Sequence, residues 1–285
     1  MEQAIRSGRG LSIFGLLNPV AMARNLWSYR ELALQMAKRD IQGRYRAARL
    51  GLLWSVLNPL VLLAIYTFVF TEVFRVRWND NSTESRGMFA LTMFCGMLLF
   101  NLFSEVVTRA PQMVVANPNY VKKIVFPLEI FIVSGLLSGI FNMLIGYVVW
   151  FIGWGVVVRE WPHVSVLWFP LVIVPVCLTS AGLSWLLASL GVFVRDVGQA
   201  VILAVQVLFF ATPIFYPIER VPQRFRRVLE LNPLTHAIED VRQVLMHDGS
   251  PNWHWWLVST GAAAVLAVLG YAFFMKSKRA FADVI

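Results

Sequence analysis

The stretch from Leu52 to Phe74, LLWSVLNPLVLLAIYTFVFTEVF, decides the fold class because it carries no charged side chain before Glu72. Charged residues resume on both sides, with Arg49 before the stretch and Arg75 after it. A bilayer core about 30 Å thick is crossed by a helix of about 20 apolar residues. The stretch therefore predicts a membrane-spanning helix.

The composition of the whole chain agrees with a membrane protein. Of its 285 residues, 58% are hydrophobic and 14% are charged, whereas soluble domains carry about 25% charged residues. Too few charged side chains remain to cover a water-exposed surface, so we expect membrane lipid as a partner. The net charge of +9 fits the Lys and Arg that accumulate in inner loops, and we do not expect a nucleic-acid partner.

Six apolar segments predict an all-α membrane protein with six transmembrane helices. They lie at about 52–74, 88–107, 130–158, 164–194, 197–216 and 254–275. The fourth segment contains Pro170 and Pro175, which we expect to kink it. The transmembrane domain thus covers residues 52–276, between an N-terminal region at 1–51 and a tail at 277–285.

The distribution of positive charge predicts the orientation of these spans. Six crossings place both termini on one side of the membrane, and most of the 25 Lys and Arg residues fall on that side. Positively charged loops remain in the cytoplasm, so we expect both termini to be cytoplasmic.

The segment from about Leu26 to Arg49 predicts an N-terminal amphipathic helix. Its polar side chains recur at steps of three and four, which is the period of one helix face: Glu31, Gln35, Lys38, Arg39, Gln42, Arg46 and Arg49. A basic amphipathic helix of this kind is typical of the inner membrane surface. A solvated helix with one charged face remains an alternative.

Two loops outside the lipid carry further patterns. The inner loop has turn signals around Pro118, and a short element in it ends at Pro127. This pattern is typical of a docking site for a cytoplasmic partner, and a loop with a purely structural role is the alternative. In the outer loop, Asn232 followed by Pro233 predicts the start of a helix. We expect two short outer helices, at about 224–231 and from 233 on, that shape a pore exit or form a cap without a gating role.

The sequence offers no catalytic, cofactor or metal site of its own. It lacks the G-x-x-x-x-G-K-[ST] phosphate loop, and its histidines and the cysteines Cys95 and Cys177 show no metal-ligand spacing. Within the spans, Glu105 stands four residues before Arg109, a spacing typical of a helix ion pair. We therefore expect a protein that is not an enzyme.

Several stretches, in a fixed order, resemble one family. The first, KRDIQGRYRAARLGLLWSVLNPLVLLAIYTFVF at 38–70, is similar to the start of the membrane subunits of type-2 ABC exporters of cell-surface polysaccharides, which include the O-antigen, capsule and teichoic-acid permeases. The later stretches are NPNYVKKIVFPLE, VFVRDVGQ, TPIFYP and LNPLTHAIEDVRQVL.

The resemblance implies a homodimeric permease of the bacterial inner membrane that exports a lipid-linked polysaccharide, with O-antigen the leading candidate. Two cytoplasmic ABC ATPase subunits would bind ATP and Mg and would supply the energy for export. The implied ATPase-coupling residues are Asn117, Tyr120, Lys122, Lys123, Phe126 and Pro127. The implied interface-helix residues are Lys38, Arg39, Asp40, Arg44 and Arg46. The implied channel residues are Tyr66, Phe70, Phe209, Phe210 and Tyr216. The implied outer-gate residues are Pro217, Asn232, Pro233, Glu239 and Arg242.

Other functions remain open at this point. An ABC exporter of a drug or a small lipid would share the same architecture. A membrane-embedded transferase would need a buried catalytic carboxylate or histidine pair, which the sequence does not suggest. A scaffold of a polymer-synthesis complex would show no dependence on an ATPase.

Overall fold

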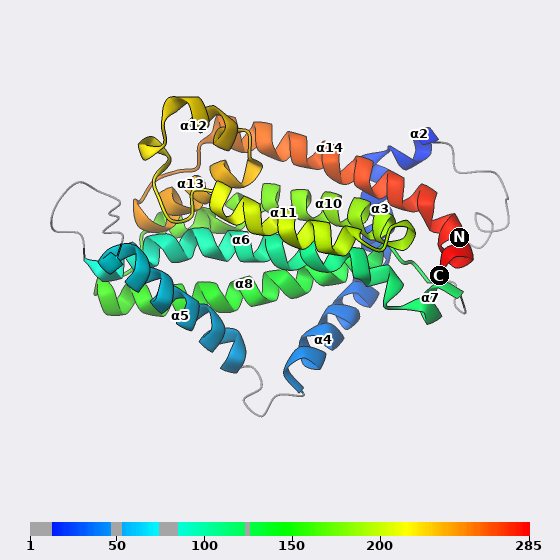
Figure 1. Cartoon of the computed structure of the whole chain (residues 1–285), viewed down its shortest axis with the longest axis horizontal. Helices are drawn as coiled ribbons and strands as arrows, with labels where there is room; N and C mark the ends of the chain where they lie inside the picture. The colour runs from blue at the N-terminus through cyan, green and yellow to red at the C-terminus, as the bar shows by residue number, and fades with distance from the viewer. Residues whose placement is uncertain (1–12, 47–52, 74–84, 123–125) are drawn as a thin grey trace.

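The computed structural model describes residues 13–46, 53–73, 85–122 and 126–285. The elements in these ranges are helical and none is a strand, which confirms the all-α prediction. Long helices run side by side through the molecule, with α12 and α13 at one end and α7 at the other (Figure 1).

Five segments are long and apolar enough to cross a membrane. They are Leu53–Val73, Arg86–Val115, Ile130–Val157, Val164–Phe193 and Trp253–Val284. The first consists of α5 (Leu53–Phe68) and a π-helical turn (Val69–Val73), and the second and third are α6 and α8. The fifth segment contains α14 (Trp253–Ser277), a 3-10 turn (Lys278–Ala280) and α15 (Phe281–Val284). The predicted tail at 277–285 is therefore largely helical.

The predicted span at 197–216 is shorter than expected, so six spans are not confirmed. Here α11 covers only Val197–Ala211, which amounts to about 22 Å at 1.5 Å per residue. Thr212 is extended, with φ −102° and ψ 137°, because the following Pro213 disfavours helical geometry in the residue before it.

The fourth segment is broken, as its prolines predict. It consists of a 3-10 helix (Val164–Trp168), α9 (Phe169–Val172) and α10 (Val174–Phe193). Pro175 lacks the N–H that would bond to the carbonyl of Leu171, four residues earlier. That carbonyl instead accepts a hydrogen bond of 3.0 Å from the indole N–H of Trp256 on α14.

Glycines allow the long helices to approach closely. A methyl group placed on Gly270 of α14 would lie 2.2 Å from the carbonyl oxygen of Gly182 on α10. A methyl group on Gly139 of α8 would lie 3.0 Å from side-chain atoms of Leu102 and Val106 on α6. Gly139 therefore marks a helix contact.

The N-terminal region contains three helices within residues 13–46, and the helix expected from about Leu26 is divided at Tyr29. They are α2 (Ile13–Leu16), α3 (Pro19–Ser28) and α4 (Arg30–Arg46). The side chain of Asn18 caps α3 by accepting from the backbone N–H groups of Val20 and Ala21. The chain turns at Tyr29, and α4 then packs against α8.

Helices are present at both positions predicted for the outer pair, α12 (Gln223–Glu230) and α13 (Pro233–Met246), and we call these two the outer helices. The side chain of Asn232 accepts a hydrogen bond of 3.0 Å from the backbone N–H of Leu234, so this predicted cap is confirmed. The residues of the apolar face of α13 are all buried: Leu234, Ile238, Val241 and Leu245.

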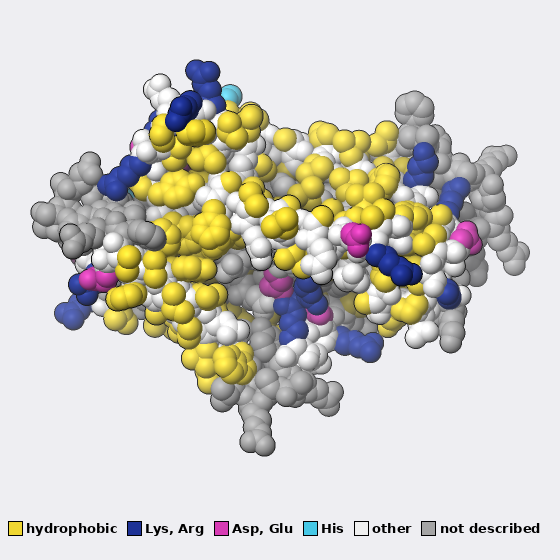
Figure 2. Space-filling model, in the orientation of Figure 1, with side chains coloured by type: hydrophobic (Ala, Val, Ile, Leu, Met, Phe, Trp, Pro, Cys, Tyr) yellow, Lys and Arg dark blue, Asp and Glu magenta, His cyan; other side chains and the backbone are white. Residues whose placement is uncertain are grey.

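Apolar side chains cover most of the face drawn in Figure 2, and charged side chains gather near its ends and beside α4. No residue of α5 is buried within the chain. This helix therefore presents apolar side chains to lipid or to another protein surface.

Candidate functional site

An aromatic cluster forms around Phe215, whose side chain is 2% exposed. Phe70 stacks on it with ring centroids 4.6 Å apart and an interplanar angle of 5°. Tyr66, Phe209 and Phe210 lie at 5.2, 5.0 and 6.3 Å from the same ring. The structure thus gathers four of the predicted channel residues from α5, the π-helical turn after it and α11.

Tyr216 joins this cluster through its hydroxyl, which donates a hydrogen bond of 3.0 Å to the backbone carbonyl of Phe210. Phe210 is 66% exposed, so one side of the cluster is open. Phe215, at the centre of the cluster, is not among the predicted channel residues. Its place inside the TPIFYP stretch was the available signal.

Arg242 on α13 connects the outer helices to this cluster. Its Nη2 donates a hydrogen bond of 2.8 Å to the carbonyl of Ile214, the residue before Phe215. Its Nε donates to the carbonyl of Thr92 on α6 at 3.4 Å. Burial lowers the pKa of Arg242 to about 10, so the side chain remains cationic at neutral pH.

An ionic cluster joins α4, α6 and α8 at the other end of α6. Asp40 accepts hydrogen bonds from Arg109 at 2.8 and 3.1 Å, from Arg44 at 2.7 Å and from Ser138 at 2.7 Å. Burial opposes the charged form of Asp40, but these donors, Arg109 first, outweigh burial and hold the pKa of the carboxyl well below its usual value. Asp40 is therefore a fixed anion that ties α4 to α6 and α8.

Glu105 belongs to the same ionic cluster. Its carboxylate accepts hydrogen bonds from Arg44 and, at 2.9 Å, from Asn142. The predicted pair with Arg109 exists at 3.8 Å, but Arg44 of α4 is the closer partner.

The predicted interface-helix residues therefore divide into two groups. Asp40 and Arg44 face α6 and α8, as the contacts above show, whereas Lys38 and Arg39 are exposed. The side chain of Arg46 lies outside the described residues. Asp40 and Arg44 lie outside the predicted polar stripe, and their contact with α6 and α8 was anticipated by neither interpretation of this helix.

The predicted coupling segment contains a short helix, α7 (Pro118–Lys122). Its Tyr120 accepts a hydrogen bond of 3.4 Å from Arg39 of α4, and its ring lies 4.7 Å from that of Phe126 and 5.7 Å from that of Phe131. The structure therefore brings this segment against the predicted interface helix.

The other predicted coupling residues surround α7. The side chain of Asn117 donates a hydrogen bond of 2.9 Å to the carbonyl of Met113. Lys122 is exposed and Pro127 is half-buried, while Lys123 lies outside the described residues.

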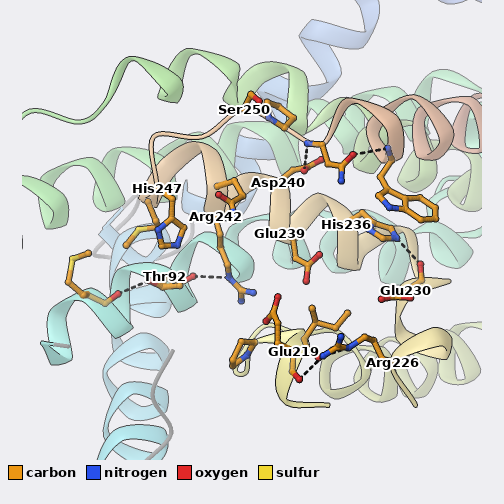
Figure 3. Close-up of a pocket in the computed structure, with 18 of the residues that line it drawn as sticks. Thr92, Glu219, Arg226, Glu230, His236, Glu239, Asp240, Arg242, His247 and Ser250 are labelled. Carbon is orange, nitrogen blue, oxygen red and sulfur yellow. Dashed lines mark hydrogen bonds between the residues drawn. The ribbon is translucent and has the colours of Figure 1, made fainter. Parts of the chain in front are cut away.

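A cavity of about 1150 Å³ opens beneath the outer helices, between α12, α13 and the ends of α6 and α14 (Figure 3). We call it the outer cavity. Its charged and aromatic lining residues are Glu219, Arg226, Glu230, His236, Glu239, Asp240, Arg242, His247 and Trp255. Of the predicted gate residues, Pro217 also lines it, whereas Asn232 caps α13 and Pro233 begins that helix.

Burial and neighbouring charges alter two carboxyl groups of the outer cavity. Burial, with the nearby Glu219 charge, raises the pKa of Glu239 to about 7. Burial raises the pKa of Asp240 to about 6, although that carboxylate accepts a hydrogen bond of 2.8 Å from the backbone N–H of Asn252. Among the residues with described positions, no group of His, Cys, Asp and Glu is arranged to hold a metal ion.

Comparison with known proteins identifies relatives that align with most of this chain. Two are named O-antigen export system permease protein RfbA. The protein from Klebsiella pneumoniae is 28% identical, and the alignment covers 93% of this chain and 99% of the relative. The protein from Myxococcus xanthus is 25% identical, and the alignment again covers 93% of this chain and 99% of the relative. The polysialic acid transport protein KpsM of Escherichia coli is 24% identical over 79% of this chain and 85% of its own.

A model of the family described as ABC-2 type transporter matches residues 31–246. That range contains the ionic cluster, the coupling segment, the aromatic cluster and both outer helices. The helical architecture with apolar spans agrees with this match. The chain therefore belongs to the ABC-2 type transporter family of membrane proteins.

Proposed function

We propose that this chain is the permease subunit of an ABC transporter that exports a lipid-linked polysaccharide, O-antigen first among the candidates, across the bacterial inner membrane. The names of the RfbA relatives support this substrate class. The aromatic cluster adds a chemical reason, because flat rings pack well against the apolar C–H faces of sugars.

The energy source in this proposal is a separate ATPase. The sequence has no phosphate-binding loop of the Walker type, so two cytoplasmic ATPase subunits would bind ATP and Mg. Their docking site would be the coupling segment, where Tyr120 already contacts Arg39 of α4. Both chain termini would lie on the same cytoplasmic side.

One observation carries the proposed mechanism: α6 contacts a different polar partner at each end. Arg109 binds Asp40 of α4, and the carbonyl of Thr92 binds Arg242 of α13. The two positions are about 26 Å apart along the helix. A shift of α4 upon ATP binding would thus reach the outer helices through one rigid element.

The conducting form in this proposal is a homodimer. Because α5 buries none of its residues within the chain, its apolar face suits a second copy. The channel between the copies would expose Tyr66, Phe70, Phe209, Phe210 and Tyr216 to the passing glycan. Movement of the outer helices would open the exit.

Deletion of the gene in cells that make the polymer tests this function. We expect surface polymer to disappear and the lipid-linked precursor to accumulate inside, with recovery only when both the chain and its ATPase are supplied. Normal surface polymer in the deletion strain would refute the proposal.

Capsule export is the second candidate, because KpsM also covers most of this chain. The same deletion distinguishes the two candidates by the polymer that is lost. Loss of capsule with intact O-antigen would favour this second candidate.

A further inference from the structure

The outer cavity is large enough to hold part of a glycan. Its volume of about 1150 Å³ is slightly larger than that of common ligand pockets, which span about 300–1000 Å³. Side chains from η3 (Ile218–Arg220), α12, α13, α14 and α6 line it together. A segment of a sugar chain would therefore meet several elements at once.

Three carboxylates in the outer cavity are available to a ligand. Within the described part of the chain, no hydrogen bond or ion pair engages the carboxylate oxygens of Glu219, Glu230 or Glu239. Glu239 on α13 and Glu219 on η3 point toward one another across the cavity (Figure 3). Ionised carboxylates only accept hydrogen bonds, so they suit the hydroxyl or ammonium groups of a sugar.

A flat aromatic surface borders the same cavity. The rings of His236 and Trp255 stack with centroids 4.4 Å apart and an interplanar angle of 9°. The ring nitrogen Nε2 of His236 lies 2.9 Å from the backbone carbonyl of Glu230, which fixes the ring. Trp255 is 40% exposed, so its ring can pack on the C–H face of a sugar.

The charges of the outer cavity disfavour an acidic ligand. Four carboxylates line it, against two guanidinium groups. Both guanidinium groups already bind backbone carbonyls, Arg226 those of Ile218 and Glu219 and Arg242 those of Thr92 and Ile214. Among the described lining residues, an anionic sugar would therefore meet more carboxylates than guanidinium groups, and repulsion would oppose its binding.

We propose that the outer cavity binds a segment of the exported glycan and accepts neutral or amino-bearing sugars while rejecting acidic ones. This inference rests on the proposed export function, because the substrate is taken to be a glycan. The aromatic pair would hold the sugar ring, and Glu219, Glu230 and Glu239 would accept hydrogen bonds from its hydroxyl or ammonium groups. The outer helices would thus take part in substrate selection.

Binding to the purified full-length chain in lipid nanodiscs tests this inference. The probes are hexamers of glucosamine, of N-acetylglucosamine and of galacturonic acid, measured at pH 8, where Glu239, with a pKa of about 7, is largely ionised. We expect the two uncharged or cationic probes to bind at least tenfold more tightly than the acidic one. Equal or tighter binding of the acidic probe would overturn the proposal.

Two variants and one control variant locate the binding site. Trp255→Ala should weaken binding of the N-acetylglucosamine hexamer at least tenfold, whereas Trp161→Ala should not, because Trp161 is 86% exposed and is not part of the cavity lining. Glu219→Gln combined with Glu239→Gln should reduce the discrimination against the acidic probe. Equal effects of the two tryptophan variants, or unchanged discrimination in the glutamine variant, would refute the assignment.

This binding measurement needs neither the ATPase nor transport. If no probe binds but the chain still restores polymer export to deleted cells, the cavity assignment fails and the permease function stands. If the probes bind as expected but export does not depend on the chain, the permease function fails instead.

Discussion

Arg109 of α6 and Asp40 of α4 form a two-point ion pair, with Nη2 to Oδ1 at 2.8 Å and Nη1 to Oδ2 at 3.1 Å. Two parallel hydrogen bonds fix both distance and orientation. The pair therefore holds α4 in one position on α6. In our account, this contact carries motion from the cytoplasmic side into the membrane.

Removal of the Asp40 carboxylate should loosen α4. Asp40→Ala leaves Arg109 and Arg44 without their shared anion, which we expect to cost about 1–3 kcal/mol and to reduce export. Thermal unfolding of the purified chain and surface polymer in cells measure the two effects. Glu31→Ala on the same helix is the control, since the Glu31 side chain is 81% exposed and its carboxylate lies 3.7 Å from Arg30. Equal effects of both variants would contradict the role of Asp40.

Stability should fall as pH rises through the range in which Glu239 titrates. The pKa of Glu239 is raised from 4.5 to about 7, so between these values the folded state binds more protons than the unfolded state. Unfolding free energy therefore decreases from pH 4.5 to pH 7. Melting temperatures at pH 5.5 and 8 should show a smaller decrease for Glu239→Gln than for the unaltered chain; the same decrease in both would refute this assignment.

The contact between α10 and α14 should not tolerate a side chain at Gly270. A methyl group there would meet the carbonyl oxygen of Gly182 at 2.2 Å, so Gly270→Ala must separate the two helices. We expect poor membrane accumulation of this variant, measured by immunoblot of membranes. Gly261→Ala on the same helix has no atom within 4 Å of the added group and should accumulate normally; similar losses in both variants would contradict the packing argument.

Charge reversal on the coupling segment should weaken its contact with the ATPase. Lys122→Glu combined with Lys123→Glu reverses the charge of Lys122, the last residue of α7, and of the residue that follows it in the sequence. We expect less ATPase in pull-downs while membrane insertion is unchanged. Arg224→Glu on α12, at the opposite end of the molecule, is the matched control. Pull-down of the ATPase at the level of the unaltered chain would count against the coupling assignment.

Loss of the flat rings should reduce export more than it reduces folding. Tyr66→Leu with Phe209→Leu keeps apolar volume near Phe215, so the core contacts survive in part, while the surface for sugar is lost. Surface polymer normalised to permease level is the measurement. Phe151→Leu on α8, where the side chain is 41% exposed, should export normally; export unaffected by the paired change would show that the rings serve packing alone.

Local patterns in the sequence predicted much of the fold. Charge-free stretches located five spans, because a bilayer tolerates few charges along a helix. Asn232 capped α13 as its side-chain chemistry predicts. The short length of α11 could also have been inferred, because Thr212 precedes Pro213 and that step ends a helix.

Contacts between segments that are distant in the sequence could not be predicted from local patterns. Periodicity paired Glu105 with Arg109 on one helix, but Arg44, 61 residues away, is the closer partner. The carbonyl of Ile214 and the guanidinium of Arg242 are 28 residues apart, and only tertiary packing brings them together. The aromatic candidates were identified by type, whereas their arrangement around Phe215 depends on how α5, α6 and α11 are placed.

Reconstitution into liposomes tests the central claim most directly. The chain, its ATPase and a lipid-linked polysaccharide are combined, and the glycan that has crossed the bilayer is measured with and without ATP. We predict transfer only when the chain, the ATPase and ATP are all present. Transfer by the purified chain alone, without the ATPase, would contradict the account.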